Sequence, residues 1–361
     1  MLIYTFAFIN SKRMDKDKHS LTPLSELGEF GLIRHLTENI RIKHPGTIKG
    51  VGDDAAVFDY GGKLVVVTTD MLAEGIHFDL VYTPLKHLGY KAIVANLSDV
   101  FAMNATPRQV LVSLAISGKF ALEHLEELYQ GIYLSCEKYN VDLAGGDTNP
   151  SLTGLIISVT ALGEVQKEDV VYRNGAKEND LICVSGDLGA AYLGLQILER
   201  EKKLFNAHPD LQPKLEAYEY ILQRQLKPEP RRDVVEFLQR EKLKPTSMID
   251  ISDGLSSELM HLCTSSGVGC KVYQEKIPVA EETAKVAEEL HLEPVTCALN
   301  GGEDYELLFT IPLEHYDKVR FREGISVIGH IVPAEEGMHL VTEAGENIPL
   351  RAQGWDGISR H

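Results

Sequence analysis

Cysteine is scarce in this chain of 361 residues, and long apolar runs are missing. The five cysteines are scattered and form no Cys-x-x-Cys pair, which excludes a disulfide framework and a cysteine zinc site and predicts reduced, mostly buried thiols in a cytoplasmic protein. No stretch approaches the ~20 apolar residues of a transmembrane helix. The apolar start of the chain is followed, not preceded, by Lys12 and Arg13, so we do not expect a signal peptide.

Basic residues are also fewer than acidic residues. Lys and Arg number 36 against 53 Asp and Glu, so the formal net charge is −17. A chain this acidic repels nucleic acid and anionic membrane surfaces, and we expect neither as a partner. The 44% of hydrophobic and 25% of charged residues are typical of a globular protein, and the length predicts two domains.

The familiar phosphate-binding signatures are absent as well. The sequence contains no Gly-x4-Gly-Lys-Ser/Thr, no Gly-x-Gly-x-x-Gly after a predicted strand, and neither His-Arg-Asp nor Asp-Phe-Gly. These absences exclude a P-loop enzyme and a protein kinase, and they disfavour a dinucleotide-binding fold.

Hydrophobic periodicity predicts strands and helices in both halves of the chain, without strict alternation of the two. The predicted strands are 55–59, 64–69, 110–116, 141–144, 155–165, 180–185, 247–251, 269–273 and 305–311. The predicted helices are 84–105, 122–139, 190–202, 215–226, 231–241, 255–266, 281–290 and 313–321, with a polar insertion at 203–214. This pattern predicts an α/β protein, with α+β mixed sheets, in two domains.

The domain boundary is predicted within the charged segment Gln166–Asn179. The N-terminal α/β domain would then comprise residues 26–165 and the C-terminal α/β domain residues 166–361. We expect the polar segment up to residue 25 to be a disordered tail.

Acidic residues gather in turns that contain Gly or Ser and that interrupt apolar segments. These turns are Gly52-Asp53-Asp54-Ala55, Thr68-Thr69-Asp70, Asn96-Leu97-Ser98-Asp99, Gly145-Gly146-Asp147-Thr148, Asp250-Ile251-Ser252-Asp253-Gly254 and Gly301-Gly302-Glu303-Asp304. Any one of them could be only a turn or a helix N-cap. Together they would be costly to bury unless cations neutralise them. Oxygen ligands without cysteine favour Mg²⁺ or Mn²⁺ over zinc, and glycines beside several such ions suggest a polyphosphate substrate.

In order along the chain, these motifs resemble the thiamine-monophosphate kinase family, in the superfamily of aminoimidazole ribonucleotide synthetase. The matching stretches include Thr-Thr-Asp-Met-Leu-x-Glu-Gly-x-His-Phe, Asn-Leu-Ser-Asp-x-x-Ala-Met, Asp-Ile-Ser-Asp-Gly-Leu and Gly-Gly-Glu-Asp-Tyr-Glu-Leu, and the similarity runs from about Gly28 to the C-terminus. The resemblance implies the two-domain architecture of that superfamily and a homodimer formed by the N-terminal domains. It also implies transfer of the γ-phosphate of ATP to thiamine monophosphate with several Mg²⁺ ions, the last step of thiamine diphosphate biosynthesis.

The resemblance assigns roles to residues that match the family's motifs. The implied magnesium ligands are Asp54, Thr68, Thr69, Asp70, Asp99, Asp147, Asp250 and Asp253. The implied ATP contacts are Tyr129, Gly146, Asp147, Arg173 and Ser252, and the implied substrate contacts are His77, Glu303 and Trp355. The chain departs from the family's Gly-Tyr-Asp-His-Phe at Gly354-Trp355-Asp356-Gly357-Ile358, where an aromatic ring is retained.

Several of these residues also have purely structural interpretations. Tyr129 fits the buried stripe of its helix, Arg173 could form a surface ion pair, and Trp355 could pack against the core. His77 is one of 13 histidines.

The chemistry of the implied acceptor agrees with the lack of a catalytic dyad. A phosphate monoester has its second pKa near 6 and is a dianion at pH 7, so no general base is expected. Three alternatives stay open. The first is another ATP-using member of the superfamily, such as aminoimidazole ribonucleotide synthetase or selenophosphate synthetase. The latter would need a reactive N-terminal cysteine, and no cysteine precedes Cys136. The others are a silent nucleotide-binding regulator and a magnesium-dependent phosphohydrolase.

Overall fold

The computed structural model describes residues 28–40, 42–208 and 213–352. The chain divides into two units, Ile42–Trp355 and a smaller one made of Met1–Arg41 and Asp356–His361. Of the smaller unit the structure describes helix α2 (Gly28–Thr37). The predicted tail and Trp355 lie outside the described residues. No helix in the described ranges is long and apolar enough to cross a membrane.

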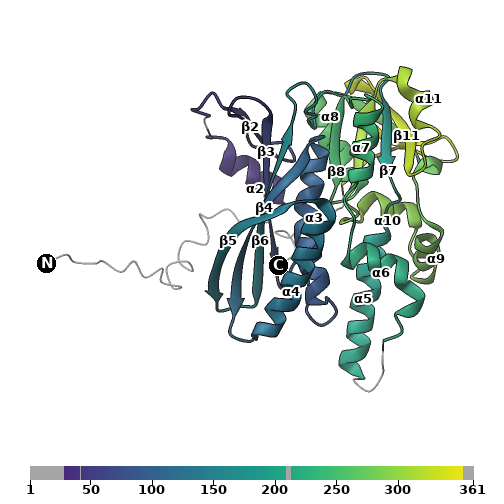
Figure 1. The fold of residues 1–361 in the computed structure, drawn as a ribbon. Helices are drawn as coiled ribbons and strands as arrows, with labels where there is room; N and C mark the ends of the chain where they lie inside the picture. Colours follow the sequence, from purple (N-terminus) through teal and green to yellow (C-terminus); the bar gives the residue numbers. More distant parts are fainter. Residues whose placement is uncertain (1–27, 41, 209–212, 353–361) are drawn as a thin grey trace, which may run out of the picture. The chain divides into compact units, whose positions relative to one another are not determined.

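The first half of the larger unit contains one mixed sheet and two long helices (Figure 1). Its elements are β1 (Thr47–Lys49), β2 (Ala56–Asp59), β3 (Leu64–Ala73), α3 (Leu85–Ala102), β4 (Thr106–Ser117), α4 (Leu122–Tyr139), β5 (Asp142–Ser151) and β6 (Leu155–Val165). The strand order is β1-β2-β3-β6-β4-β5. Strands β4 and β5 are parallel, whereas the other neighbouring pairs are antiparallel.

The second half contains a second mixed sheet, of order β13-β12-β9-β11-β7-β10-β8, with several helices. Its strands are β7 (Leu181–Ser185), β8 (Ser247–Ile251), β9 (Gly269–Tyr273), β10 (Glu306–Ile311), β11 (Ile325–Val332), β12 (Met338–Val341) and β13 (Asn347–Pro349). Its α-helices are α5 (Ala190–Ala207), α6 (Glu219–Leu226), α7 (Arg232–Arg240), α8 (Leu255–Ser266), α9 (Glu281–Glu289), α10 (Pro294–Asn300) and α11 (Tyr316–Val319). Short 3-10 turns lie at η2 (Glu216–Tyr218), η3 (Gln274–Lys276), η4 (Leu313–His315) and η5 (Ala334–Glu336). The predicted mixed α/β class is confirmed.

Helix α3 lies in the centre of the larger unit and is buried along most of its length, from Leu88 to Ala102 with Asp99 excepted. It packs on β3, β4 and β6 on the first-sheet side and on β8 and α6 on the other. It also packs tightly against α4. A Cβ atom at Gly89 would lie 2.0 Å from the carbonyl oxygen of Leu128, and one at Gly131 would lie 1.9 Å from that of Lys86. Only glycine allows the two helix backbones to approach this closely.

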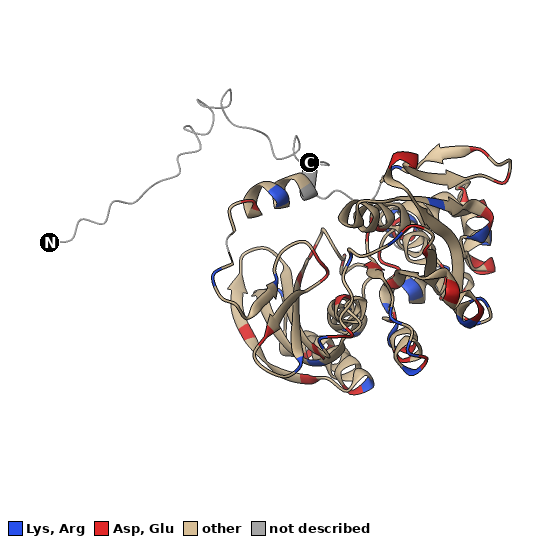
Figure 2. Cartoon of the chain, turned by 90° about the horizontal axis from the view of Figure 1, so that it is seen from above, with Lys and Arg blue, Asp and Glu red and all other residues tan. Residues whose placement is uncertain are grey.

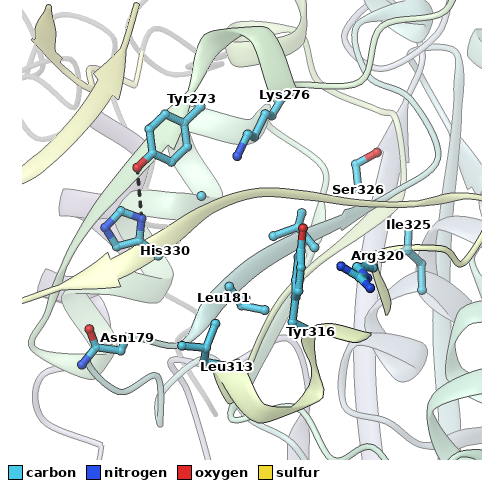
Figure 3. Close-up of a pocket in the computed structure, with 12 residues that line it drawn as sticks. Asn179, Leu181, Tyr273, Lys276, Leu313, Tyr316, Arg320, Ile325, Ser326 and His330 are labelled. Carbon is cyan, nitrogen blue, oxygen red and sulfur yellow. Dashed lines mark hydrogen bonds between the residues drawn. The ribbon is translucent and has the colours of Figure 1, made fainter. Parts of the chain in front are cut away.

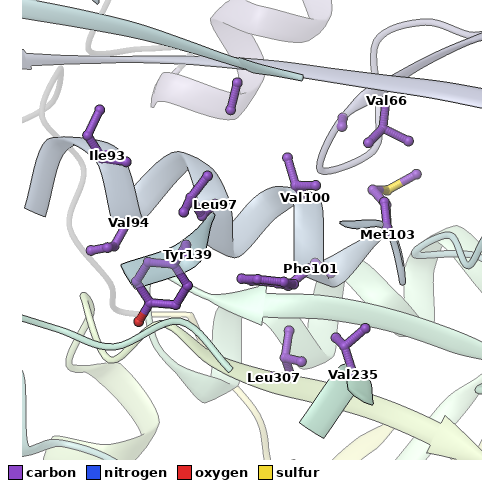
Figure 4. Close-up of a cluster of buried hydrophobic side chains, with 14 of the residues drawn as sticks. Val66, Ile93, Val94, Leu97, Val100, Phe101, Met103, Tyr139, Val235 and Leu307 are labelled. Carbon is purple, nitrogen blue, oxygen red and sulfur yellow. The ribbon is translucent and has the colours of Figure 1, made fainter. Parts of the chain in front are cut away.

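One hydrophobic core joins residues from both sheets. Val66 of β3 and Phe101 of α3 belong to the same buried cluster as Val235 of α7 and Leu307 of β10 (Figure 4). A second cluster lies on the other face of the second sheet and includes Leu308, the neighbour of Leu307. The second sheet is therefore covered on both faces.

The structure corrects three details of the predicted elements. Helix α5 continues to Ala207, so the predicted insertion 203–214 begins as helix. Helix α10 was not predicted, and the predicted helix 313–321 is reduced to η4 and the four-residue α11. The predicted strands at 64–69 and 141–144 extend to Ala73 and Ser151, because β3 pairs with β6, and β5 with β4, along these residues.

Strand extension changes the setting of two predicted acidic turns. Asp70 and Asp147 lie inside strands and Asp99 lies inside helix α3. The turn prediction holds for Asp54, which precedes β2, and for Asp253, which follows β8. Lys, Arg, Asp and Glu are distributed over the helices and loops, with both signs close together (Figure 2).

Candidate functional site

Three predicted carboxylates meet inside the larger unit. Oxygen atoms of Asp54, Asp99 and Asp250 all lie within 4.8 Å of one another. They come from the segment before β2, from α3 and from the middle of β8, where Asp250 faces Leu307 of β10 in the strand register. We call these three residues the acidic triad.

Burial raises the pKa of each carboxyl group of the acidic triad. Removal from water raises the pKa of Asp54 to about 6, against the attraction of the Arg173 guanidinium. Removal from water, followed by repulsion from Asp54, raises the pKa of Asp250 to about 7. The pKa of Asp99 is also raised well above its usual value, first by removal from water and then by Asp250, Asp70 and Asp54. Such a cluster favours binding of protons or of a metal cation.

The contacts of the acidic triad test whether a cation fits. Arg173 donates from Nη2 to Oδ1 of Asp54 at 2.7 Å, but the buried Oδ2 of Asp54 has no hydrogen-bond partner among the described residues. The neighbouring Asp53 is occupied, since it accepts the backbone N–H of Arg173 at 3.0 Å and pairs with Lys49 at 3.2 Å. A partnerless buried oxygen among three carboxylates fits a hard divalent cation such as Mg²⁺.

Strand β3 places two predicted ligands beside the acidic triad and turns one away. Thr68 donates its hydroxyl to Oδ2 of Asp99 at 2.7 Å. Asp70 lies two residues along and therefore on the same face. Its backbone N–H donates to Oδ1 of Asn96 at 3.1 Å. Removal from water raises the pKa of Asp70, and nearby His77 opposes that shift. The hydroxyl of Thr69 instead donates to the carbonyl oxygen of Val159 at 3.0 Å.

Strand β5 carries Gly146 and Asp147. A Cβ atom at Gly146 would lie 1.7 Å from the carbonyl oxygen of Val112, so only glycine fits there beside β4. The exposed carboxylate of Asp147 accepts the backbone N–H of Thr148 at 2.9 Å and the side-chain amide of Asn149 at 2.6 Å. Asp147 is not part of the acidic triad.

The predicted nucleotide contact Tyr129 lies on α4, half-buried against the first-sheet core. Its ring is 5.7 Å from that of Tyr133. Its core packing agrees with the structural interpretation of the sequence and does not exclude contact with a ligand.

The segments after β8 and before β10 lie side by side. The carbonyl oxygen of Ser252 accepts the backbone N–H of Glu303 at 2.7 Å, and that of Ile251 accepts the N–H of Tyr305 at 2.9 Å. The N–H of Asp253 donates to the buried carboxylate of Glu258 at 3.0 Å. The predicted residues Ser252, Asp253 and Glu303 are thereby brought together next to Asp250.

The predicted substrate contact His77 lies just beyond β3. Its Nδ1 atom accepts the backbone N–H of Ala73 at 3.0 Å, which directs the proton of a neutral ring to Nε2. The other aromatic substrate contact, Trp355, lies outside the described residues.

The sequence reasoning missed several charged residues near these segments. Lys91 of α3 pairs with Glu303 at 2.9 Å. The available signal was a lysine directly before the apolar run Ala92–Ala95. Glu306 pairs with Arg224 at 2.9 Å and with Arg231 at 2.6 Å.

The sequence analysis also did not predict the structural role of Asp304, the aspartate of the Gly-Gly-Glu-Asp motif. Asp304 accepts the backbone N–H groups of Gly189 and Ala191 at 2.7 and 3.3 Å, at the start of α5. The helix N-terminus stabilises its charge, and Asp304 therefore supports the fold.

A concavity of about 680 Å³ lies away from the acidic triad, along β11 (Figure 3). Tyr273 and His330 line it and face each other, with the hydroxyl 3.5 Å from Nδ1. Its charged side chains Lys276 and Arg320 are exposed, and no predicted site residue lines it. We assign it no role.

Comparison with known proteins identifies similar chains. The family model "AIR synthase related protein, N-terminal domain" matches residues 52–165. The thiamine-monophosphate kinase of Aquifex aeolicus is 35% identical over 327 residues, which cover 88% of this chain and 99% of that protein. The thiamine-monophosphate kinase of Bacillus subtilis is 33% identical over 295 residues, 81% of this chain and 86% of that protein. Among solved structures, AaThiL complexed with AMPPCP and TMP superimposes with a TM-score of 0.79 at 34% identity and covers 93% of this chain and 99% of that one.

Proposed function

The chain belongs to the thiamine-monophosphate kinase family and is an enzyme of that kind, and we propose that it transfers the γ-phosphate of ATP directly to thiamine monophosphate. The products would be thiamine diphosphate and ADP. The relative solved with AMPPCP and TMP supports both substrates. The observation that carries the proposal is the acidic triad with the partnerless Oδ2 of Asp54.

We propose that several Mg²⁺ ions bind at the acidic triad and the residues next to it. Asp54, Asp99 and Asp250 would hold the metal, with Thr68 and Asp70 adjacent. The family resemblance adds Thr69, Asp147 and Asp253. When bound, Mg²⁺ neutralises phosphate oxygens and stabilises the charge that develops on the transferred group.

The nucleotide contacts are proposed on the same basis. Tyr129, Gly146, Asp147, Arg173 and Ser252 would bind ATP. Arg173 already donates to Asp54, so its guanidinium is fixed beside the acidic triad with further donors in its planar fork. It can therefore bind a phosphate oxygen without a change of rotamer.

The acceptor's own charge replaces a general base. An oxygen of the thiamine monophosphate dianion forms the new bond to the γ-phosphorus, while the bond from that phosphorus to the β,γ-bridging oxygen breaks and ADP departs. No proton has to be removed from the acceptor. The residues His77, Glu303 and Trp355 would bind and orient thiamine monophosphate, and no phosphorylated enzyme forms.

We further propose that residues 26–165 mediate dimerisation and bind ATP and Mg²⁺, while residues 166–361 complete the site. The enzyme would be a cytoplasmic homodimer. Exposed apolar side chains of the first sheet, Met71 and Leu111, support partner burial on its outer face. Light scattering should give twice the 40.1 kDa of one chain; a monomer at micromolar concentration would contradict the dimer.

The deciding experiment incubates purified protein with ATP, Mg²⁺ and thiamine monophosphate and separates the products by chromatography. We expect thiamine diphosphate and ADP in equal amounts, and no product when EDTA removes the metal. Thiamine should be a very poor acceptor, because its alcohol needs a base. Release of phosphate without thiamine diphosphate would favour a phosphohydrolase, and ATP binding without turnover would favour a silent regulator.

A further inference from the structure

Lys91 is a buried lysine in the central helix. The residue is only 5% exposed, on a helix packed against the first sheet on one side and against β8 and α6 on the other. Its ammonium group donates to the backbone carbonyl oxygen of Gln225 at 2.9 Å and pairs with Oε1 of Glu303 at 2.9 Å. A lysine is buried only where such partners offset the loss of water.

Glu303 is held at both carboxylate oxygens. While Lys91 binds Oε1, the side-chain amide of Gln225 donates to Oε2 at 2.8 Å. Gln225 is itself 5% exposed. A carboxylate can accept about four hydrogen bonds, so these two contacts fix its orientation and leave acceptor capacity free.

The backbone conformation of Glu303 is unfavourable, so its contacts help to hold the residue in place. Its φ angle is +67°, a left-handed conformation that a non-glycine residue adopts at a cost. Its N–H donates to the carbonyl oxygen of Ser252, two residues from Asp250 of the acidic triad. The backbone of Glu303 is thus held next to the segment that carries Asp250, and Lys91 and Gln225 fix its side chain.

We propose that Lys91 is a positioning residue that, together with Gln225, fixes the carboxylate of Glu303 for contact with the thiamine monophosphate. The inference rests on the proposed function, since it takes Glu303 as a substrate contact. Lys91 itself does not touch the reacting atoms; it acts through Glu303.

The test compares Lys91→Met with the wild type in steady-state kinetics. We expect the KM for thiamine monophosphate to rise about tenfold while the KM for ATP changes by less than about twofold, because a substrate contact is misplaced. Gln225→Met should produce a smaller rise of the same kind. The matched control is Lys138→Met, which removes another ion pair between the two halves, Lys138 with Glu229 at 2.6 Å, and should leave both KM values unchanged.

If Lys91→Met folds poorly, the double variant Lys91→Met/Glu303→Gln provides a second test. It leaves no unpaired charge in the interior, so it should fold. Its KM for thiamine monophosphate should equal that of Glu303→Gln alone. An additive rise in the double variant, equal rises in both KM values, or an unchanged KM in Lys91→Met would each overturn the positioning role. A wild-type protein that makes no thiamine diphosphate would instead refute the proposed function, so the two failures are distinguishable.

Discussion

The two sheets of the larger unit differ in how far their strands, and the acidic residues on them, are exposed to solvent. In the first sheet β6 alternates between buried and half-buried residues, and β3 has an exposed stretch, Thr69–Met71, before its last two residues. In the second sheet β7, β8 and β10 are buried at every residue. Asp147 therefore lies on an exposed strand, whereas Asp250 holds its carboxylate inside a sheet covered on both faces.

The acidic residues proposed for the site therefore differ in how much their charge costs the stability of the folded state. The exposed carboxylate of Asp147 costs little in stability. The buried carboxylate of the second sheet destabilises the folded state unless a cation or a proton neutralises it. The predictions below test this contrast from the largest expected effect to the smallest.

The first prediction compares Asp250→Asn with Asp147→Asn. Both should lower kcat by roughly 10²–10³-fold, since each removes a proposed ligand of the charge-stabilising metal site. In metal-free buffer only Asp250→Asn should raise the melting temperature, because it removes repulsion with Asp54. Coupled assays and thermal melts with EDTA measure both effects. Near wild-type turnover of either variant at low Mg²⁺ would contradict its role as a ligand.

The second prediction concerns packing on the two sheets. Leu307 and Leu308 of β10 are both 0% exposed and belong to different core clusters, so replacing either with alanine should lower the free energy of unfolding by about 2–5 kcal/mol. In β4, Leu111 is 37% exposed in the single chain, so Leu111→Ala should cost the monomer less than about 0.5 kcal/mol. Any larger cost should depend on protein concentration, because the proposed partner chain covers this face. Urea unfolding gives the three values. A large cost at Leu111 that does not depend on protein concentration would contradict this contrast between the two sheets.

The third prediction is a pH dependence of the metal-free protein. Folding raises the pKa of Asp54 and Asp250 from 3.8 to about 6 and about 7. As the pH rises through this window, the unfolded chain loses these protons first, so the free energy of unfolding falls. The loss for Asp250 is on the order of 4 kcal/mol.

Melting temperatures in EDTA should therefore decline between about pH 4 and pH 7, and Mg²⁺ should reduce the decline. Asp250→Asn should flatten the profile, whereas Glu343→Gln, an exposed control, should not. A rise in stability with pH over that range would show that the carboxyl groups of the acidic triad are charged without penalty.

The smallest expected effect is that of His77→Ala. Loss of a substrate contact should raise the KM for thiamine monophosphate by up to about tenfold and leave the KM for ATP nearly unchanged. If His77 were a general base, kcat would fall roughly 10²–10⁴-fold and recover as pH rises. Kinetics at several pH values separate the two roles.

The sequence predicted the mixed sheets and the convergence of acids well, for physical reasons. Alternating apolar residues set the buried face of β6, and three of the carboxylates that interrupt apolar segments, those at 54, 99 and 250, meet. It could not predict that Asp70 and Asp147 lie inside strands, because pairing with β6 and β4 extends those strands past the local signal.

The sequence also could not predict which groups form hydrogen bonds or ion pairs with each acidic side chain. The motif Gly-Gly-Glu-Asp-Tyr-Glu contains three acids of similar appearance. Only the fold shows that Asp304 accepts bonds from the start of α5 and that Glu306 lies between two arginines, while Glu303 faces Lys91. These contacts join residues more than 70 positions apart, which no local pattern reports.

The tight glycine contact between α3 and α4 has a consequence for folding. Both helices, the first sheet and part of the second share one hydrophobic core, so α3 cannot unfold unless both halves open. Its amide hydrogens should exchange with solvent only through global unfolding, and they should be the last in the chain to exchange. The helix that carries Lys91 and Asp99 is thus the cooperative centre of the molecule, and heating should abolish the acidic triad and the fold at one temperature.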